Sequence, residues 1–174
     1  MVIDENEKWF SGGEARTDDE REFLDQLRRD AASWTNDVKP ADTQAFAWES
    51  GPLIVGVDIP KLTTALRHLW VSYWLVEPDQ RALEGAWGDD LIADRYTGDR
   101  VEDLTVTGVE AKPAQFATWC SMWLYSQLKR PVVREEWGPR KAEIWKLADT
   151  NMKLQVKGVW WKRLGPPTKV HRER

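Results

Sequence analysis

The placement of the twelve tryptophans constrains this chain more than any other feature of its sequence. Each buried indole removes roughly 150–250 Å² of surface from water, so a few of them can hold a small core together. The chain has 174 residues, of which 41% are hydrophobic, and this length suits one domain. We therefore expect a single domain over residues 1–174, with core tryptophans at positions where helical or alternating spacing turns a side chain inward: Trp34, Trp48, Trp70, Trp74, Trp119 and Trp123.

Apolar spacing and capping signals predict three helices. The first follows the capping-box sequence Thr17–Glu20 and runs over about residues 18–35. The second begins near Pro60 and carries apolar residues three or four apart as far as Leu75. The third begins at Pro113 and matches the helical template for about 17 residues.

Short alternating or apolar runs between and after these helices predict strands. We expect an α+β fold in which the three helices pack on one face of a mainly antiparallel or mixed sheet of six to seven strands. Residues 1–16 form an N-terminal arm. Residues 165–174 form a basic C-terminal tail, in which Gly-Pro-Pro and dense charge exclude a strand or a stable helix. The predicted strands are 44–49, 53–57, 91–96, 104–109, 131–137, 143–149 and 154–160.

Two segments of the chain resemble each other. Trp70-x-x-x-Trp74-Leu75 and Trp119-x-x-x-Trp123-Leu124 are each followed, 13 or 14 residues later, by Trp-Gly. A duplicated strand-helix-strand unit would explain this similarity and would place two helices side by side on one sheet. Chance is the competing explanation in a chain so rich in tryptophan.

Charge is distributed unevenly along the chain. The formal net charge is −4, but acidic residues outnumber basic ones two to one in residues 1–128, whereas basic residues are in large excess in residues 129–174. Such a division indicates either a polyanion-binding tail or two halves that attract each other, within the fold or across a dimer. The sequence does not choose between these alternatives.

The N-terminal and cysteine patterns favour a cytoplasmic protein without a cofactor. Acidic residues stand where a secretory signal needs a basic start, and no apolar stretch has the ~18 residues of a membrane helix. The one cysteine, Cys120, excludes an intramolecular disulfide and a cluster of thiolate metal ligands. No glycine-rich phosphate loop is present. We therefore expect no cofactor, no metal and no membrane contact.

The sequence contains few residues that could form a catalytic site. His68 is expected on a helix, His171 lies in the tail, and Cys120 occupies a core position of the third helix, so a structural interpretation is favoured for each. One acidic cluster could hold a metal or act on a sugar, but interleaved arginines favour a solvated loop. The members of this cluster that we single out are Asp89, Asp90, Asp94 and Asp99.

The basic and aromatic C-terminal segment is the most suggestive candidate surface. Adjacent strand residues point to opposite faces, so Trp160 and Trp161 cannot both lie inside a one-sided sheet. A protein surface that binds single-stranded nucleic acid also needs basic side chains next to aromatic rings. The acidic pI of about 5.3, however, disfavours a nucleic-acid partner. The candidate binding residues are Trp145, Trp160, Trp161, Lys162, Arg163 and Arg172.

These observations favour a protein-binding module, an adaptor or immunity-type protein without enzymatic activity, that self-associates or occludes a basic partner through its acidic half. The first alternative is a small-ligand or sugar-binding domain with a carboxylate-based hydrolase site in the acidic cluster. The second alternative is a nucleic-acid accessory protein that uses the basic aromatic C-terminus. A pocket with convergent carboxylates near Trp87 would favour the first alternative.

Overall fold

The computed structural model describes residues 8–13, 15–47, 49–62, 67–77, 80–88, 103–138, 142–158 and 165–174. These residues form two α-helices and nine strands in two antiparallel sheets, so the α+β class is confirmed but the prediction of three helices on one sheet of six to seven strands is wrong. In chain order the elements are α1 (Asp18–Ala31), the short 3-10 helix η2 (Pro40–Asp42), β1 (Thr43–Ala47), β2 (Leu53–Asp58), β3 (His68–Glu77), β4 (Gln80–Trp87), β5 (Leu104–Val109), α2 (Pro113–Leu128), β6 (Val132–Trp137), β7 (Ala142–Leu147), β8 (Lys153–Lys157) and β9 (Lys169–Arg172).

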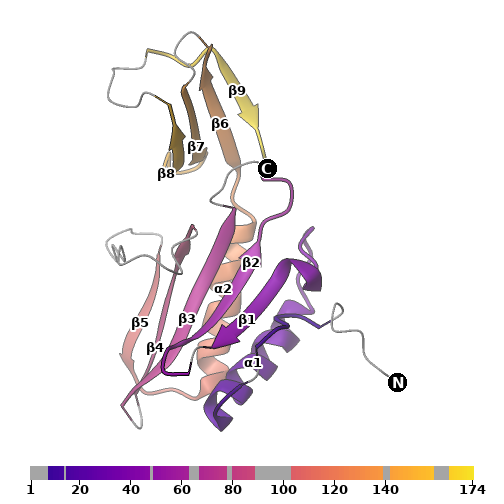
Figure 1. Cartoon of the computed structure of the whole chain (residues 1–174), viewed down its shortest axis with the longest axis vertical. Helices are drawn as coiled ribbons and strands as arrows, with labels where there is room; N and C mark the ends of the chain where they lie inside the picture. Colours follow the sequence, from indigo (N-terminus) through magenta and orange to yellow (C-terminus); the bar gives the residue numbers. More distant parts are fainter. Residues whose placement is uncertain are drawn as a thin grey trace.

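The β1–β5 sheet has its strands in sequence order, and each strand is antiparallel to its neighbour. Both helices lie against one face of this sheet and pack on each other (Figure 1). Strand alternation supplies the inner face, because Leu69, Val71 and Tyr73 of β3 are all buried in the same core. Phe23 of α1 stacks on Tyr73 with ring centroids 4.2 Å apart. The main core therefore lies between the helices and the sheet.

The capping box predicted before α1 is present in part. The Thr17 side chain accepts a hydrogen bond from the Glu20 amide, as expected for an N-cap residue. The Glu20 carboxylate binds the amide and the guanidinium of Arg16 rather than closing the box on Thr17. The helix ends at Ala31, four residues before the predicted end.

Gly85 allows α2 to approach the sheet closely. A Cβ atom at this position would lie 2.8 Å from the carbonyl oxygen of Trp70 and 3.3 Å from the indole ring of Trp123. Such distances leave no room for a side chain. The absence of a side chain at Gly85 is therefore a packing requirement.

The β6–β9 sheet has the strand order β8-β7-β6-β9 and lies beyond one end of the β1–β5 sheet along the long axis of the molecule (Figure 1). Its edge strand β9 comes from the tail that was predicted to form no strand, and that prediction is wrong. Pairing explains the difference: β9 aligns antiparallel with β6, and the amide of Glu173 donates to the carbonyl of Val132 at 2.9 Å. Backbone pairing across a sheet outweighs the weak local propensity of a charged segment.

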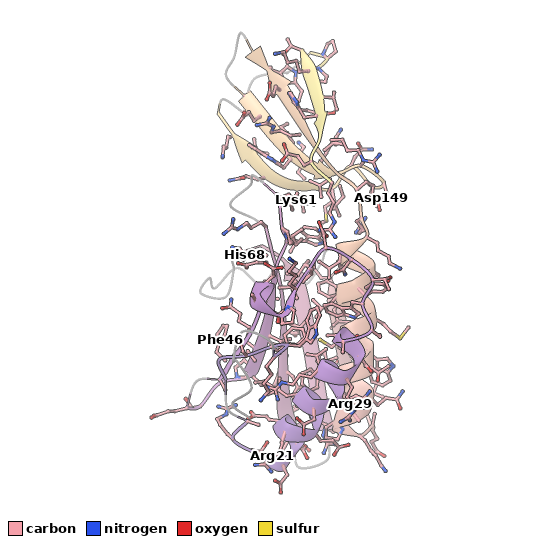
Figure 2. The ribbon with its side chains drawn as sticks, turned by 90° about the vertical axis from the view of Figure 1, so that its right-hand side faces the viewer. Arg21, Arg29, Phe46, Lys61, His68 and Asp149 are labelled. Carbon is pink, nitrogen blue, oxygen red and sulfur yellow. The ribbon has the colours of Figure 1, made fainter. Side chains whose placement is uncertain are left out.

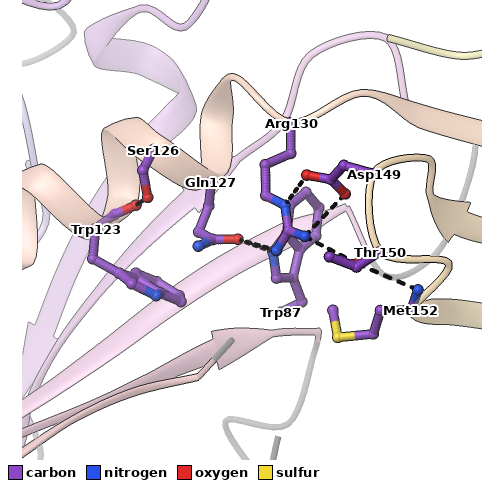
Figure 3. Close-up of polar contacts among 8 residues, drawn as sticks. All are labelled: Trp87, Trp123, Ser126, Gln127, Arg130, Asp149, Thr150 and Met152. Atoms are coloured by element: carbon purple, nitrogen blue, oxygen red, sulfur yellow. Dashed lines mark hydrogen bonds and ion pairs between the residues drawn. The ribbon is translucent and has the colours of Figure 1, made fainter. Parts of the chain in front are cut away.

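Polar contacts join the two sheets where α2 ends (Figure 3). The Gln127 Oε1 atom accepts hydrogen bonds from Trp87 Nε1 at 2.9 Å and from Arg130 Nη1 at 3.2 Å. Arg130 also donates to Asp149 and to Thr150 in the turn between β7 and β8. The contact network thus links β4, α2 and the β6–β9 sheet.

A second ion pair joins the C-terminal residue to the segment between α1 and η2. Arg174 Nη2 lies 3.0 Å from Asp37 Oδ1, and Lys61 contacts the same carboxylate at 3.5 Å. Figure 2 shows Lys61 and Asp149 near the level at which the sheets meet. The end of the basic tail is therefore held by β6 and by an acidic residue from the N-terminal half.

The prediction of a second helix is wrong, because the C-terminal part of that segment forms the strand β3. Apolar residues line both faces of this strand: Leu69, Val71 and Tyr73 face the helices, and Trp70 and Ser72 face the opposite side but are also buried. A strand that is apolar on both faces matches a helical template as well as a strand template. His68, expected on that helix, instead begins β3 and is hydrogen-bonded through Nδ1 to Asp58 on β2.

The proposed internal duplication is also wrong. Trp70 and Trp74 lie on the strand β3, whereas Trp119 and Trp123 lie on the helix α2. The two similar sequences therefore form different structures. The predicted strand 91–96 lies outside the described residues. No helix in the described part of the chain is both long and apolar enough to cross a membrane.

Candidate protein-binding surface

An apolar groove lies between β5 and α2. Its volume is about 430 Å³. Of its lining residues, Val109 is 39% exposed and Met122 is 65% exposed, although both are large and apolar. We call this feature the β5–α2 groove, and its lining consists of Leu104, Val106, Val109, Trp119 and Met122.

Both elements that form the groove were predicted from sequence. Alternation on β5 turns Leu104 and Val106 toward the core, where they pack against it, while Thr105 points the other way. On α2, Trp119 and Met122 are three residues apart and therefore neighbours on one side of the helix. The groove forms because β5 is the last strand of its sheet, so nothing in the described part of the chain continues the layer beside α2.

The β1 edge of the same sheet is covered by the N-terminal arm. The Ala45 amide donates to the carbonyl of Ser11 at 2.8 Å, and a Cβ atom at Gly13 would lie 2.6 Å from the Ala45 carbonyl oxygen. The arm therefore lies directly against β1. Covering an edge in this way prevents its pairing with another chain.

The other three edges differ in charge. The edge strand β8 carries Lys153 and Lys157, and the edge strand β9 carries Lys169 and Arg172. The sequence of β5 is Leu-Thr-Val-Thr-Gly-Val, without a charged residue or a proline. Among the four edges formed by the described residues, β5 alone is neither charged nor paired with the N-terminal arm. The strand is bulged between Val106 and Val109, and its uncharged edge is a template for strand addition.

Carboxylates flank the uncharged strand. Asp103 precedes β5, and Glu110 follows it and is exposed. Charge at the rim and apolar side chains at the centre are the usual arrangement of a protein interface. The surface therefore suits an apolar extended segment with a basic residue beside Glu110.

A second cavity of about 340 Å³ lies at the start of α1, beside Tyr73 and Trp74. Its charges are already paired, because Arg16 binds Glu20 and Arg81 Nη2 lies 2.6 Å from Asp19 Oδ2. Burial, reinforced by the Asp19 carboxylate, raises the pKa of Tyr73, so its hydroxyl stays protonated. This arrangement has the features of a structural ion-pair network.

Most residues of the predicted C-terminal surface lie outside the described residues: Trp160, Trp161, Lys162 and Arg163. The prediction that Trp145 is a surface residue is wrong, because this indole is only 1% exposed. Two cations lie over its ring, with Lys157 Nζ 4.6 Å and the Arg134 guanidinium 5.8 Å from the ring centroid. Arg172 is exposed on β9, where it pairs with Val133 of β6.

The predicted acidic cluster of Asp89, Asp90, Asp94 and Asp99 also lies outside the described residues. Trp87, beside which a carboxylate pocket was considered, is 5% exposed and hydrogen-bonded to Gln127. Among the residues that the structure describes, no group of three or more His, Cys, Asp or Glu side chains is placed to hold a metal ion. Cys120 is fully buried, and this burial raises the pKa of its thiol.

Sequence reasoning missed the β5–α2 groove. The helical template identified the apolar stripe of α2 but not the exposure of Met122, which lies off that stripe. A large apolar residue outside the buried stripe of a helix is the signal that could have revealed it.

We compared the chain with protein-family models, with curated proteins and with solved structures, and none of the three comparisons found a match.

Proposed function

We propose that this chain is a protein-binding module that receives an extended segment of a partner at the outer edge of β5. The observation that supports this proposal is the coincidence of an uncharged sheet edge with the apolar β5–α2 groove beside it. An added strand would bond to the backbone of β5, which is bulged between Val106 and Val109, and would place side chains in the groove. Strand addition of this kind provides affinity through the main chain and specificity through the side-chain pockets.

The shape and chemistry of the groove favour a peptide over a small polar ligand. The lining side chains are apolar or aromatic, and methionine at position 122 can adapt to differently shaped side chains. The exposed Glu110 follows the end of β5. A partner segment with apolar residues along the groove and a basic residue beside Glu110 fits this pattern.

A synthetic peptide of this design tests the proposal. We expect a peptide with valines at alternate positions and a lysine at each end to shift the backbone amide NMR signals of Val106–Val109 and of Met122. Val109→Lys should weaken binding at least about tenfold, because a charge would enter the apolar centre of the contact. Val170→Lys is the matched control, since Val170 is an exposed valine on the distant edge strand β9.

The same peptide with proline at alternate positions cannot donate main-chain hydrogen bonds and should not bind. Shifts confined to β8 or β9, or binding that Val109→Lys leaves unchanged, would refute the proposal. Equal effects of Val109→Lys and Val170→Lys would also refute it, because they would show a nonspecific charge effect.

A further inference from the structure

The two helices that cover the β1–β5 sheet differ in charge. Nine of the fourteen residues of α1 are charged, and those on its outer side, such as Asp18 and Glu22, are exposed. None of the sixteen residues of α2 is charged. A surface helix normally carries charged or polar residues opposite its apolar face, as α1 does. The outer side of α2 lacks charge and exposes Met122 instead, so it is suited to a protein contact.

A stripe of four residues runs along this outer side of α2: Gln115, Trp119, Met122 and Ser126. Trp119 is partly buried, and the other three residues are exposed. Successive members are four, three and four residues apart, which keeps them on one side of a helix. The spacing is the same when the stripe is read in the opposite direction. The stripe can therefore pair with a second copy of itself that runs antiparallel.

A two-fold axis midway between Trp119 and Met122 gives each residue of the stripe a defined partner. Trp119 of one copy lies beside Met122 of the other, and a thioether next to an indole is a favourable contact. Gln115 of one copy lies opposite Ser126 of the other. Ser126 Oγ already donates to the carbonyl of Trp123 at 2.7 Å, so its oxygen is left to accept a hydrogen bond from the Gln115 amide.

The charges around the stripe permit this pairing. An antiparallel arrangement places the N-terminal end of each helix beside the C-terminal end of the other, which is the favourable orientation of two helix dipoles. Lys112 and Lys129 then come to the same level. Lys129 Nζ lies 3.8 Å from the centroid of its own Tyr125 ring, whose hydroxyl is hydrogen-bonded to Thr35, so Lys129 is held on the α1 side of the helix. The exposed Glu110, two residues before Lys112, offsets the remaining positive charge.

We propose that two copies of this chain associate through their α2 stripes, antiparallel and about a two-fold axis. The same surface is used by both copies, so the assembly closes at two. A helix of 16 residues is about 24 Å long, and a contact of this length lies at the small end of protein interfaces. The dimer is therefore weak and exchanges with the monomer. Met122 accordingly stays accessible to small reagents in dilute solution.

The dimer has a consequence for the β5–α2 groove. Trp119 and Met122 line this groove and also lie at the centre of the dimer contact. A partner segment seated beside β5 and a second copy of the chain would therefore exclude each other. This consequence rests on the proposed function of the β5 edge, whereas the dimer itself does not.

Disulfide formation between two cysteine variants tests the antiparallel register. Within one copy, positions 115 and 126 are about 16 Å apart along the helix. In the dimer each lies opposite the other, so an equimolar mixture of Gln115→Cys and Ser126→Cys should form a linked species of twice the chain mass of 20.2 kDa under mild oxidation. Neither variant should form this species alone. Cys120 does not interfere, because it is fully buried.

Two outcomes of this experiment would overturn the proposal. A linked species from each variant alone would show a parallel arrangement or random collision. A mixture without any linked species would show that positions 115 and 126 of two copies do not meet.

Sedimentation measured against concentration tests the dimer without added cysteines. We expect the average mass of the wild type to rise toward twice the chain mass. Met122→Lys should raise the dimer dissociation constant at least about tenfold, because two like charges would then lie close together at the centre of the contact. Val76→Lys is the matched control, since Val76 is an apolar residue on β3 that is 54% exposed and lies outside the stripe. Equal effects of the two variants, or a wild type that is monomeric at every concentration, would refute the dimer.

The lysine-flanked peptide separates the failure of the dimer from that of the proposed function. If the wild type is monomeric and the peptide still binds at β5, the dimer alone fails. If the wild type dimerises and the peptide does not bind, the proposed function alone fails. If both hold, the peptide should lower the average mass to that of the monomer, and a dimer that persists with saturating peptide would contradict their mutual exclusion.

Discussion

The Arg130 guanidinium makes a two-point contact with the Asp149 carboxylate: Nε donates to Oδ2 and Nη2 donates to Oδ1, each at 2.9 Å. Arg130 follows the C-terminal end of α2, and Asp149 lies in the turn between β7 and β8. Its side-chain hydrogen bonds with Arg130 lower the pKa of Asp149. This pair therefore connects the β6–β9 sheet to the helix that packs on the other sheet.

Replacing Asp149 should weaken this connection. We expect Asp149→Ala to lower the free energy of unfolding by about 1 kcal/mol, because a charge-assisted pair is lost at a partly exposed site. The thermal midpoint should fall by roughly 2–4 °C. Asp25→Ala is the control, since Asp25 makes a longer, exposed contact of 3.5 Å with Arg28.

The same pair predicts a pH dependence. Because the pKa of Asp149 is lower in the folded protein than in the unfolded chain, the pair stabilises the fold above the usual carboxyl pKa of about 4. That stabilisation is lost as the pH falls through the lower pKa of the folded state. The difference in thermal midpoint between wild type and Asp149→Ala should therefore shrink below about pH 4. A constant difference down to pH 2 would contradict this assignment.

Glu84 should have the opposite pH dependence. Burial raises the pKa of this carboxyl, so folding favours its protonated form. Stability from this group is present below the usual pKa of about 4.3 and is lost as the pH rises through the higher folded-state pKa. Glu84→Gln should therefore raise the thermal midpoint at pH 7 relative to wild type, and the two midpoints should converge in acid. Glu22→Gln, at an exposed position of α1, provides the comparison.

Gly85→Ala should destabilise the main core. The new Cβ atom would meet the Trp70 carbonyl oxygen at 2.8 Å, and backbone atoms in the middle of a sheet cannot move away easily. We expect a loss of about 1–3 kcal/mol in urea unfolding. Gly56→Ala should cost less, because its nearest neighbour, at 3.3 Å, is the flexible side chain of Gln44. If both substitutions lowered the free energy of unfolding equally, the close contact at Gly85 would not be the cause of the loss.

Cys120 should be inert in the folded protein. It is fully buried, and its raised pKa keeps the thiol protonated. A chromogenic disulfide reagent at pH 8 should react with it only after unfolding in guanidinium chloride. Met122→Cys, two residues along the same helix at a 65% exposed position, should react at once under native conditions. Rapid reaction of the wild type would show that α2 opens easily.

Local sequence signals correctly predicted the helices and strands whose apolar residues follow one clear spacing. The Thr17 cap, the Pro113 helix start and the alternation over 104–109 each coincide with an observed boundary. In these segments the apolar residues fall on one face, so one conformation satisfies both propensity and burial. The predicted strands before and after the turn at Thr150 agree with β7 and β8 for the same reason.

Segments that are apolar on both faces, or polar throughout, could not be assigned in this way. The sequence of β3 fits a helical pattern because Trp70 on its outer face is also apolar and buried. The sequence of β9 has no apolar pattern of its own. Each becomes a strand through pairing with a neighbour that is distant in sequence: β3 pairs with β2 and β4, and β9 pairs with β6. Backbone hydrogen bonds across a sheet depend on the partner strand, which a local window of sequence does not contain.

By itself the sequence determined the α+β class and the two helices, because these follow from local periodicity. It did not determine which tryptophans form the core: Trp145 and Trp87 are buried there, whereas Trp119 and Trp123 are only partly buried. Tertiary structure alone decided that the strands divide into two sheets and that β5 ends one of them beside Met122. Strand order is set by contacts between segments far apart along the chain. For that reason an exposed edge and the groove beside it exist only in the folded molecule.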